Sequence, residues 1–460
     1  MATHGILLFL TVLVPLISAQ CNYRTATPYF KRSVYEFTLK LAERINLETE
    51  SHFVASALSP WTLLSTISLG ASDDTLQEIR EVLQLHPHQC FNNLYFELVN
   101  QVTEKPSNPT ASMLERSSTI FFDDSLYVKQ TFFEAVSKIG ICDARIVSFL
   151  DTAETAEIIN NHVRSVTNEA IDEIVTQTDL EGITTVMIDA LYFKGAWKVP
   201  FPYEDTESSA FYDDKGQQIG DVSLMYVSGP FNVTTVPQIR AQVLELPYGD
   251  NSRYSMLIFL PQTDVSVTAM VDLMKSISIS SIFVLFKENR IATVDVQIPR
   301  FKISSDIDNL KELLVDMGFK TIFDPQRANF PGISDYQLSL SNFIQKADIE
   351  VTEDGTVAAV ATAALFESRM MPEQFVANKP FLFMIVDRIL HIPIFTGAYS
   401  KPMIERLNAT LHTHGTIYDQ GHKSAKFKNL SFQHDRVRNL LIHNDRSLIG
   451  PLSRNRVVVE

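Results

Sequence analysis

A single arginine follows a run of small, uncharged side chains near the carboxyl end of this chain. The stretch EDGTVAAVATAALFESRMMPEQF begins at Glu353, ends at Phe375 and presents Arg369. A guanidinium makes charge-assisted hydrogen bonds in an acidic pocket, so Arg369 has the chemistry of a recognition residue for another protein. The nine residues from Thr356 to Ala364 contain neither a charge nor a proline.

The run of small residues is compatible with more than one structure. In a strand, its alternating Thr, Ala and Val side chains would be small enough to enter between two existing strands. No proline would interrupt the hydrogen-bond ladder, and Gly355 permits a turn just before the run. The segment can therefore exist as an exposed loop and still become a central strand. An Ala-rich helix or a static strand also fits the composition.

Motifs of catalysis are missing from the sequence. It contains no G-x-S-x-G, H-E-x-x-H, P-loop or G-x-G-x-x-G motif, so the nucleophile-elbow and zinc-protease interpretations lose their best local support. With the family resemblance given below, we expect no catalytic residues, no enzymatic turnover and no cofactor. His86 with His88, and His412 with His414, form two His-x-His pairs. Because no third and fourth ligand lies nearby, we expect solvated histidines and no metal site.

Charge divides the chain into an acidic body and a basic extension. Residues 403–460 carry nine Lys and Arg and five Asp and Glu, which is a charge of +4. Because the net charge of the whole chain is −15, the remaining residues carry −19. The acidic body argues against nucleic acid as a partner. We expect the His-containing extension to be loosely ordered, as a solvated tail or as a contact for an anionic surface.

The first nineteen residues have the pattern of a secretory leader. An apolar run from Gly5 to Ile17 is followed by Ser18 and Ala19. The run is shorter than the roughly 20 residues of a membrane span, so we expect a signal peptide, residues 1–19, and a secreted, extracellular protein without a membrane anchor.

Cysteines and glycosylation sequons agree with an exported chain. The three cysteines, Cys21, Cys90 and Cys142, leave at least one thiol free or paired outside the molecule, and the sequence does not say which. The predicted glycan sites are Asn232, Asn408 and Asn429.

Hydrophobic periodicity predicts helices in the first 180 residues and strands in the rest. We expect helices over residues 30–45, 59–70 with Ser59 as the cap, 151–171 and 306–317. The strongest predicted strands are TTVMIDALYFKG, VLELPY, YSMLIFLP and FLFMIVD. The last is apolar on both faces, which is typical of a central strand.

Several of these segments resemble one family, the serpins, over residues 28 to 402. The motifs are ALYFKGAWKVPF, SPWTLLSTISLGA, FKISSDIDNLKELLVDMGFKTIFDP with ANFPGIS, EDGTVAAVATAA, and FVANKPFLFMIVD with IFTGAY. They occur in family order, and the chain is most similar to secreted arthropod serpins. The resemblance implies an α+β fold in which helices pack around three β-sheets, a serpin domain over residues 20–402, and an exposed, mobile reactive-centre loop over about 354–376.

The resemblance also implies a reaction. The family's scissile bond lies sixteen residues after the hinge glutamate, Glu353, and twelve before Phe381, and both counts give Arg369–Met370. A trypsin-like extracellular serine protease would attack this bond and become trapped covalently as the cut loop inserts. The implied hinge is Glu353, Asp354, Gly355, Thr356, Val357, Ala358, Ala359, Val360, Ala361 and Thr362.

Other positions carry family roles beside simpler interpretations. Trp197 and an Arg300–Glu353 pair match the breach, where the loop first enters, but they also fit core packing and a surface ion pair, respectively. Ser59 matches the shutter under the sheet. Asp189 and Gln345 depart from the family's common asparagine and histidine.

We expect a monomeric inhibitor, and by analogy a regulator of a clip-protease cascade in melanisation or innate immunity. The alternatives are a non-inhibitory carrier or storage serpin and a protein that proteases merely cut. The hinge distinguishes the carrier, because charged or bulky residues there would block insertion.

Overall fold

The computed structural model describes residues 21–104, 112–249, 253–289, 292–307, 309–354 and 372–402. The hinge from Gly355 onward, the Arg369–Met370 bond, the predicted leader, and the 403–460 extension with its two sequons lie outside the described residues.

Most helices precede most strands, as the periodicity predicts. The helices are α1 Tyr23–Glu48, α2 Leu58–Ile67, α3 Asp73–Leu83, α4 Gln89–Thr103, α5 Gln130–Ile139, α6 Thr152–Val166, α7 Val267–Leu273, α8 Ile279–Glu288 and α9 Leu310–Met317. A side-chain capping box between Asn22 and Thr25 starts α1. One face of α1, including Phe30, Val34 and Phe37, is buried, which confirms the predicted amphipathic helix.

Four predicted helix boundaries are wrong. Helix α2 ends at Ile67 rather than at Gly70, because residues 68–70 form a turn. Ser59 lies inside α2 rather than at its cap, and the Ser56 hydroxyl accepts a hydrogen bond from the Ser59 backbone N–H instead. Helix α6 ends at Val166 because Asn168 and Glu169 adopt positive φ angles, which a right-handed helix cannot contain. Asp306 belongs to a strand, since its backbone pairs with a neighbouring strand, and α9 begins only at Leu310.

The strands form two hydrogen-bonded sheets. They are β1 Phe53–Ala55, β2 Ser112–Asp123, β3 Asp143–Val147, β4 Thr185–Gly195, β5 Glu207–Tyr212, β6 Gln218–Val236, β7 Ala241–Pro247, β8 Tyr254–Pro261, β9 Ala292–Pro299, β10 Phe301–Ile307, β11 Asn342–Val351, β12 Glu373–Val376, β13 Phe381–Asp387 and β14 Ile392–Tyr399. Strand β13 is buried at every residue between β14 and β8, which confirms the predicted central strand.

The larger sheet has the order β1-β14-β13-β8-β7-β6-β9-β12, with β5 also paired to β6. The long strand β6 pairs with β7 near its end and with β5 and β9 earlier, so it connects two smaller sheets. The second sheet has the order β10-β11-β4-β2-β3. With β6 shared, this arrangement accommodates the three sheets that the family resemblance implies.

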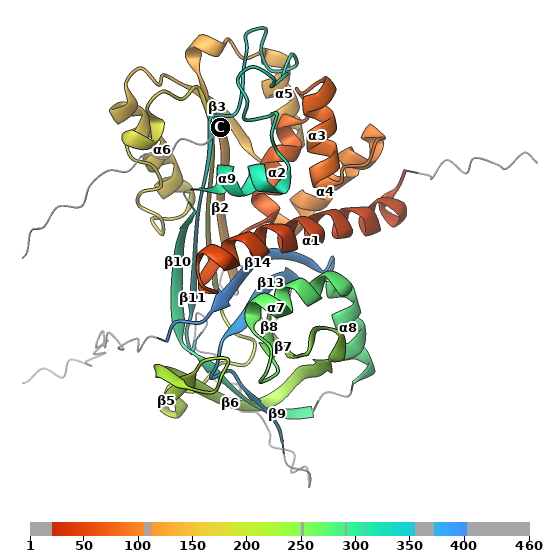
Figure 1. Ribbon diagram of the computed structural model, residues 1–460, viewed down its shortest axis with the longest axis vertical. Coiled ribbons are helices and arrows are strands. Elements are labelled where there is room, and N and C mark those ends of the chain that lie inside the picture. Colours follow the sequence, from red (N-terminus) through yellow and green to blue (C-terminus); the bar gives the residue numbers. More distant parts are fainter. Residues whose placement is uncertain are drawn as a thin grey trace, which may run out of the picture. The chain divides into compact units, whose positions relative to one another are not determined.

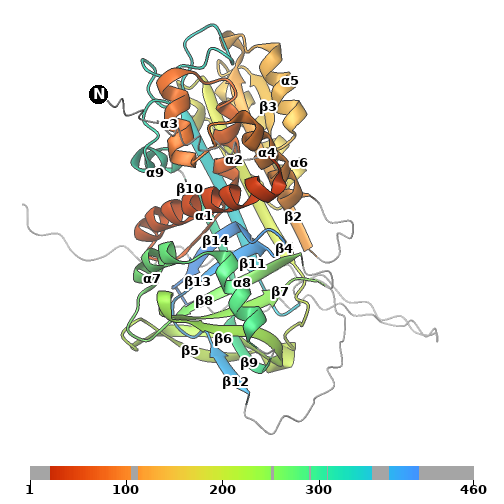
Figure 2. The same ribbon diagram turned by 90° about the vertical axis from the view of Figure 1, so that its right-hand side faces the viewer.

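Helices cover both faces of the five-stranded sheet. Met187 and Phe343 pack into the large core with α2, whereas Ile188 and Ile344 face a smaller core with α6. In both views α1 crosses the middle of the described chain, with α3 and α5 toward one end and β5, β6 and β9 toward the other (Figures 1 and 2). Among the described residues, no single helix has the length and apolarity of a membrane span. Two consecutive helical segments, 267–276 and 279–288, have that length and apolarity only when taken together, and an 87° bend separates them.

Candidate functional site

Two parallel neighbours, β4 and β11, lie inside the five-stranded sheet. Their register runs from Asn342 opposite Val186 to Ile349 opposite Phe193. Strand β11 ends at Val351, and the chain continues through Glu353 into the run of small residues. The run therefore starts at the carboxyl end of this strand pair.

An indole fixes the point where β11 ends. Trp197 donates a hydrogen bond from Nε1 to the Thr352 carbonyl at 2.8 Å. Its ring stacks on Tyr248 with centroids 4.5 Å apart, and an isolated bridge joins the two backbones. Because the indole is buried and its N–H is satisfied, Trp197 holds the start of the loop against the sheet.

Glu353 is fully buried at the same point. Its carboxylate accepts a hydrogen bond from the Thr206 hydroxyl at 2.8 Å and lies 3.4 Å from Nη1 of Arg300. Its carbonyl accepts from the Phe201 backbone N–H at 3.0 Å. The structure thus brings together Trp197, Arg300 and Glu353, as the sequence predicts.

The next residue, Asp354, is also anchored. Its carboxylate accepts a hydrogen bond from the hydroxyl of Tyr203. Two causes raise the pKa of Tyr203 above its ordinary value: burial is the larger, and this hydrogen bond to a carboxylate is the second. The last two described residues before the run are therefore held by separate side chains, and the small residues begin immediately beyond this anchor.

A polar cluster joins side chains of β4 and β11 farther along the strand pair. Gln345 lies directly opposite Asp189 in the register, and its Nε2 donates to the carboxylate at 2.6 Å. Ser118 on β2 donates to the other carboxylate oxygen at 2.6 Å. Burial raises the pKa of Asp189 to about 6, although Ser118, Gln345 and the charge of Arg116 oppose that shift.

The same cluster ties the sheet to α2. Gln345 accepts from the Ser56 backbone N–H at 3.1 Å and donates to the Ser56 carbonyl at 2.9 Å. The Ser56 hydroxyl lies 3.4 Å from that of Ser59. Gln345 therefore contacts both Asp189 on β4 and the residue two positions before α2, and Ser59 lies in α2 beside this cluster.

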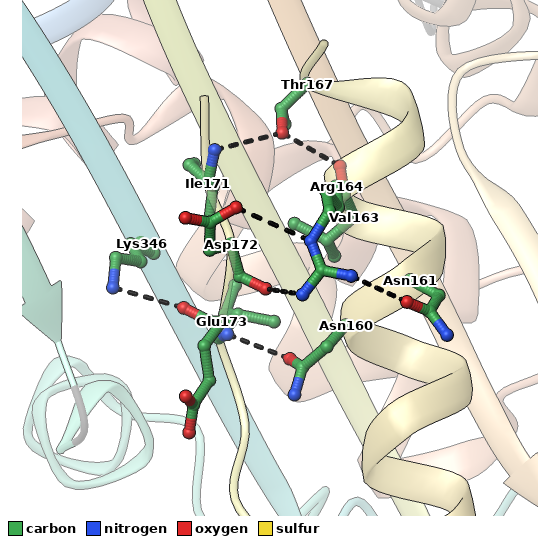
Figure 3. Close-up of polar contacts among 10 residues, drawn as sticks. Asn160, Asn161, Val163, Arg164, Thr167, Ile171, Asp172, Glu173 and Lys346 are labelled. Carbon is green, nitrogen blue, oxygen red and sulfur yellow. Dashed lines mark hydrogen bonds and ion pairs between the residues drawn. The ribbon is translucent and has the colours of Figure 1, made fainter. Parts of the chain in front are cut away.

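The segment after α6 is fastened to β11 (Figure 3). Arg164 donates to the Asp172 carbonyl at 2.9 Å, and Asn160 accepts from the Ile174 backbone N–H at 2.9 Å. Lys346 on β11 donates to the Glu173 carbonyl at 3.1 Å. Its ammonium also pairs with Asp306 of β10 at 3.1 Å. Lys346 therefore joins β11 to the segment that follows α6.

The structure decides the cysteine pairing that the sequence leaves open. Cys21 and Cys90 form a disulfide between the start of α1 and α4, and Cys142 is a free thiol. Burial raises the pKa of Cys142 to about 11, so the thiol remains protonated at neutral pH.

The one sequon inside the described residues is half-buried. Asn232 lies in β6, and its Nδ2 donates to Glu245 at 2.7 Å. A glycosylated asparagine keeps one N–H, so a glycan can be attached only if the remaining hydrogen serves Glu245 or that bond is lost.

His86 stacks on Phe91, with ring centroids 3.8 Å apart, and lies beside His88. Within the described residues, no group of three His, Cys, Asp or Glu side chains is placed to hold a metal ion.

Comparison with known proteins identifies the family. The family model described as Serpin (serine protease inhibitor) matches residues 32–402. The chain is 32% identical over 372 residues to the leukocyte elastase inhibitor of Xenopus tropicalis, covering 80% of this chain and 97% of that protein. It is 29% identical over 411 residues to the macrophage plasminogen activator inhibitor 2 of Mus musculus, covering 80% and 98%.

Solved insect structures share the fold. Serine protease inhibitor (serpin)-12 of Manduca sexta aligns with a TM-score of 0.70 and 27% identity, over 80% of this chain and 98% of that one. Serpin48 of Tenebrio molitor, described as highly specific, aligns with a TM-score of 0.67 and 28% identity, over 81% and 97%. The chain belongs to the serpin family, and its relatives are protease inhibitors rather than enzymes.

Sequence reasoning missed several contacts at this site. Nothing in the sequence analysis identified Thr206, Tyr203 or Ser118 as part of the site. Ser118 had one signal, because it is a polar residue shortly before the apolar positions 120–122. The Lys346 contact had no sequence signal, because its partner at Glu173 is a backbone carbonyl.

Proposed function

We propose that this chain is a secreted, monomeric inhibitor of trypsin-like serine proteases that is cleaved at Arg369–Met370 and traps the protease covalently. The position of the run of small residues supports this proposal most directly. In the sequence it follows an anchored Glu353, just after the carboxyl end of β11, the parallel neighbour of β4.

The direction of the chain makes insertion possible. A segment that turns back at Gly355 after β11 would run antiparallel to β11 and to its parallel neighbour β4. It would thereby find hydrogen-bond partners on both edges, and its small side chains would enter without charge or bulk. Insertion would break the β4–β11 ladder and the Gln345–Asp189 contact, and it would replace that one ladder with a ladder on each side of the inserted segment, which favours the inserted state.

The protease chemistry follows from Arg369. A protease with an acidic specificity pocket binds its guanidinium, and the enzyme's serine attacks the Arg369 carbonyl. The peptide bond to Met370 breaks, and an ester to the protease serine forms. Insertion of residues 356 onward then carries the ester-linked protease away before water releases it.

Two observations support secretion. The Cys21–Cys90 disulfide is typical of an oxidising compartment, and the chain begins with a leader-like apolar run. We propose that the target belongs to an extracellular cascade of Arg-specific proteases, such as a clip-protease cascade in immunity.

The test is incubation of the intact protein with trypsin. A covalent complex that survives boiling in detergent supports inhibition. Cleaved chains without a complex would indicate a protein that proteases merely cut. An unchanged protein would indicate a carrier. Arg369→Ala should abolish the complex with trypsin and leave the thermal unfolding of the intact protein unchanged. The matched control is Arg327→Ala, in the segment after α9. Undiminished trapping by Arg369→Ala would refute the assigned bond.

A further inference from the structure

A buried carboxyl lies on the face of the five-stranded sheet that α2 covers. Met187 and Leu191 of β4 pack into the large core, so Asp189 between them points to the same side. Its side chain is fully buried and is bonded to Ser118 of β2 and to Gln345 of β11. One carboxyl group therefore contacts both strands that flank β4.

Arg116 of β2 supplies the nearest opposite charge. It lies two residues before Ser118 on the same face of the sheet, and its charge favours the ionised form of Asp189. Its Nη2 donates to the Ile141 carbonyl at 2.7 Å, and its Nη1 is buried without a hydrogen-bond partner among the described residues. No described carboxylate forms an ion pair with this guanidinium, so its charge acts on Asp189 from beyond contact distance.

The other groups around the cluster leave Asp189 as its proton-binding site. Two residues near Arg116 influence the charge of that guanidinium: Cys142, whose thiol is protonated at neutral pH, and the exposed Asp143. From the α2 side, the uncharged Ser56 and Ser59 face the cluster. Within the described part of this cluster, Asp189 is therefore the buried group that changes its charge below neutral pH.

Solvent reaches the edge of the cluster. A cavity of about 430 Å³ lies beside β2 and α5, and Arg116 and Ser118 line it together with the exposed Ser137 and Asp143. Because Ser118 both lines the cavity and donates to Asp189, it connects the buried carboxyl to water. A proton can therefore reach or leave Asp189 without unfolding of the sheet.

The balance of forces on Asp189 sets the direction of a pH effect. Burial raises the pKa of Asp189 to about 6, although its hydrogen bonds and the charge of Arg116 favour the ionised form. Ionised Asp189 thus destabilises the paired strands. When β4 and β11 separate, Gln345 leaves and water hydrates the carboxylate, so the pKa returns toward its ordinary value of 3.8. Because the paired strands bind the proton more tightly, separation becomes easier as pH rises from 4 through 6.

We propose that Asp189 and Arg116 form a pH switch that controls the separation of β4 from β11. Neutral Asp189 keeps the strands paired, ionised Asp189 favours their separation, and Arg116 sets the pH at which the change occurs. This inference rests on the insertion step of the proposed function. Near neutral pH the switch speeds insertion and favours trapping of the protease, whereas in acid it slows insertion and favours release of the cleaved chain.

The experiment measures how fast the sheet of the intact, full-length protein accepts a peptide. A synthetic peptide with the sequence of residues 356–366 contains no titratable side chain. It carries a pH-insensitive fluorophore at its amino end and an amide at its carboxyl end, and its entry is followed by size-exclusion chromatography. Entry requires separation of β4 from β11 but no protease.

The rate of entry should rise about tenfold from pH 5 to pH 7, as a pKa of about 6 in the paired strands and 3.8 in the separated strands requires. A rate that stays constant or falls with rising pH would overturn the switch and leave the insertion step intact. Failure of the peptide to enter at any pH would overturn the insertion step, and the switch with it.

Variants assign the effect to its residues. Asp189→Asn removes the charge, so entry at pH 7 should be slower than in the wild type and independent of pH. Arg116→Met should move the midpoint of the pH profile upward, because the charge that favours ionised Asp189 is lost, and Arg116→Lys should restore it. Thermal unfolding checks that each variant is folded. A wild-type profile in folded Asp189→Asn, or an unmoved midpoint in folded Arg116→Met, would refute the assignment.

The matched control is a second buried carboxylate, Asp348 of β11. Alternation along the strand places it on the opposite face from Gln345, and it accepts a hydrogen bond from Ser304 at 2.5 Å. Asp348→Asn should therefore keep the wild-type pH profile. Loss of the profile in this variant would assign the pH dependence to Asp348 and overturn the role of Asp189.

Discussion

Replacement of Asp189 by asparagine tests the polar cluster that joins β4 and β11. Burial raises the pKa of Asp189 from 3.8 to about 6. A carboxyl whose pKa is higher in the folded than in the unfolded state makes its full contribution to the free energy of unfolding below pH 4. That contribution is lost as pH rises through about 6. At about 1.4 kcal/mol per pKa unit, the loss is about 3 kcal/mol.

The geometry allows asparagine to keep both hydrogen bonds. Its oxygen can accept from Gln345 Nε2, whose orientation is fixed by Ser56, and its amide can donate to the Ser118 hydroxyl. Asp189→Asn therefore removes the buried charge with little loss of contacts. We expect the variant to gain about 3 kcal/mol over the wild type between pH 4 and pH 7.

The assay is urea-induced unfolding of the intact protein at four pH values from 4 to 7, followed by tryptophan fluorescence. The difference between variant and wild type isolates Asp189, because all other titrations are shared. Asp316→Asn, at an exposed carboxylate on α9, is the matched control and should show a constant difference. A constant difference for Asp189→Asn, or a variant that loses stability as pH rises, would refute the reasoning.

Three further changes probe the site. Thr356→Arg should convert the inhibitor into a substrate, because a buried unpaired charge opposes insertion; the ratio of covalent complex to cleaved chain measures this, and full complex yield would contradict it. Glu353→Gln should lower the free energy of unfolding by about 3 kcal/mol, because Arg300 loses its buried counter-charge, and an unchanged urea midpoint would argue against this role. Lys346→Met should lower it by about 1 kcal/mol and speed hydrogen exchange in residues 172–174, because the segment after α6 is released from β11; unaltered exchange would exclude this tether.

Local sequence patterns determined much of the architecture. The apolar run of β13 predicts a strand buried on both faces, and the spacing along α1 predicts its buried stripe. These features follow from side-chain periodicity, which depends only on near neighbours. The uncharged run after Glu353 and the arginine beyond it are likewise properties of the sequence, and they remain predictions, since the structure does not describe them.

Tertiary structure decided which distant groups meet. The register places Gln345 opposite Asp189, folding joins Cys21 to Cys90, and Lys346 finds a backbone carbonyl far away in the chain. The position of Ser59 inside α2 was also misjudged from the sequence, because Ser56 supplies the bond expected of a cap. Long-range pairs such as these depend on strand register and packing, and local propensity carries no information about either.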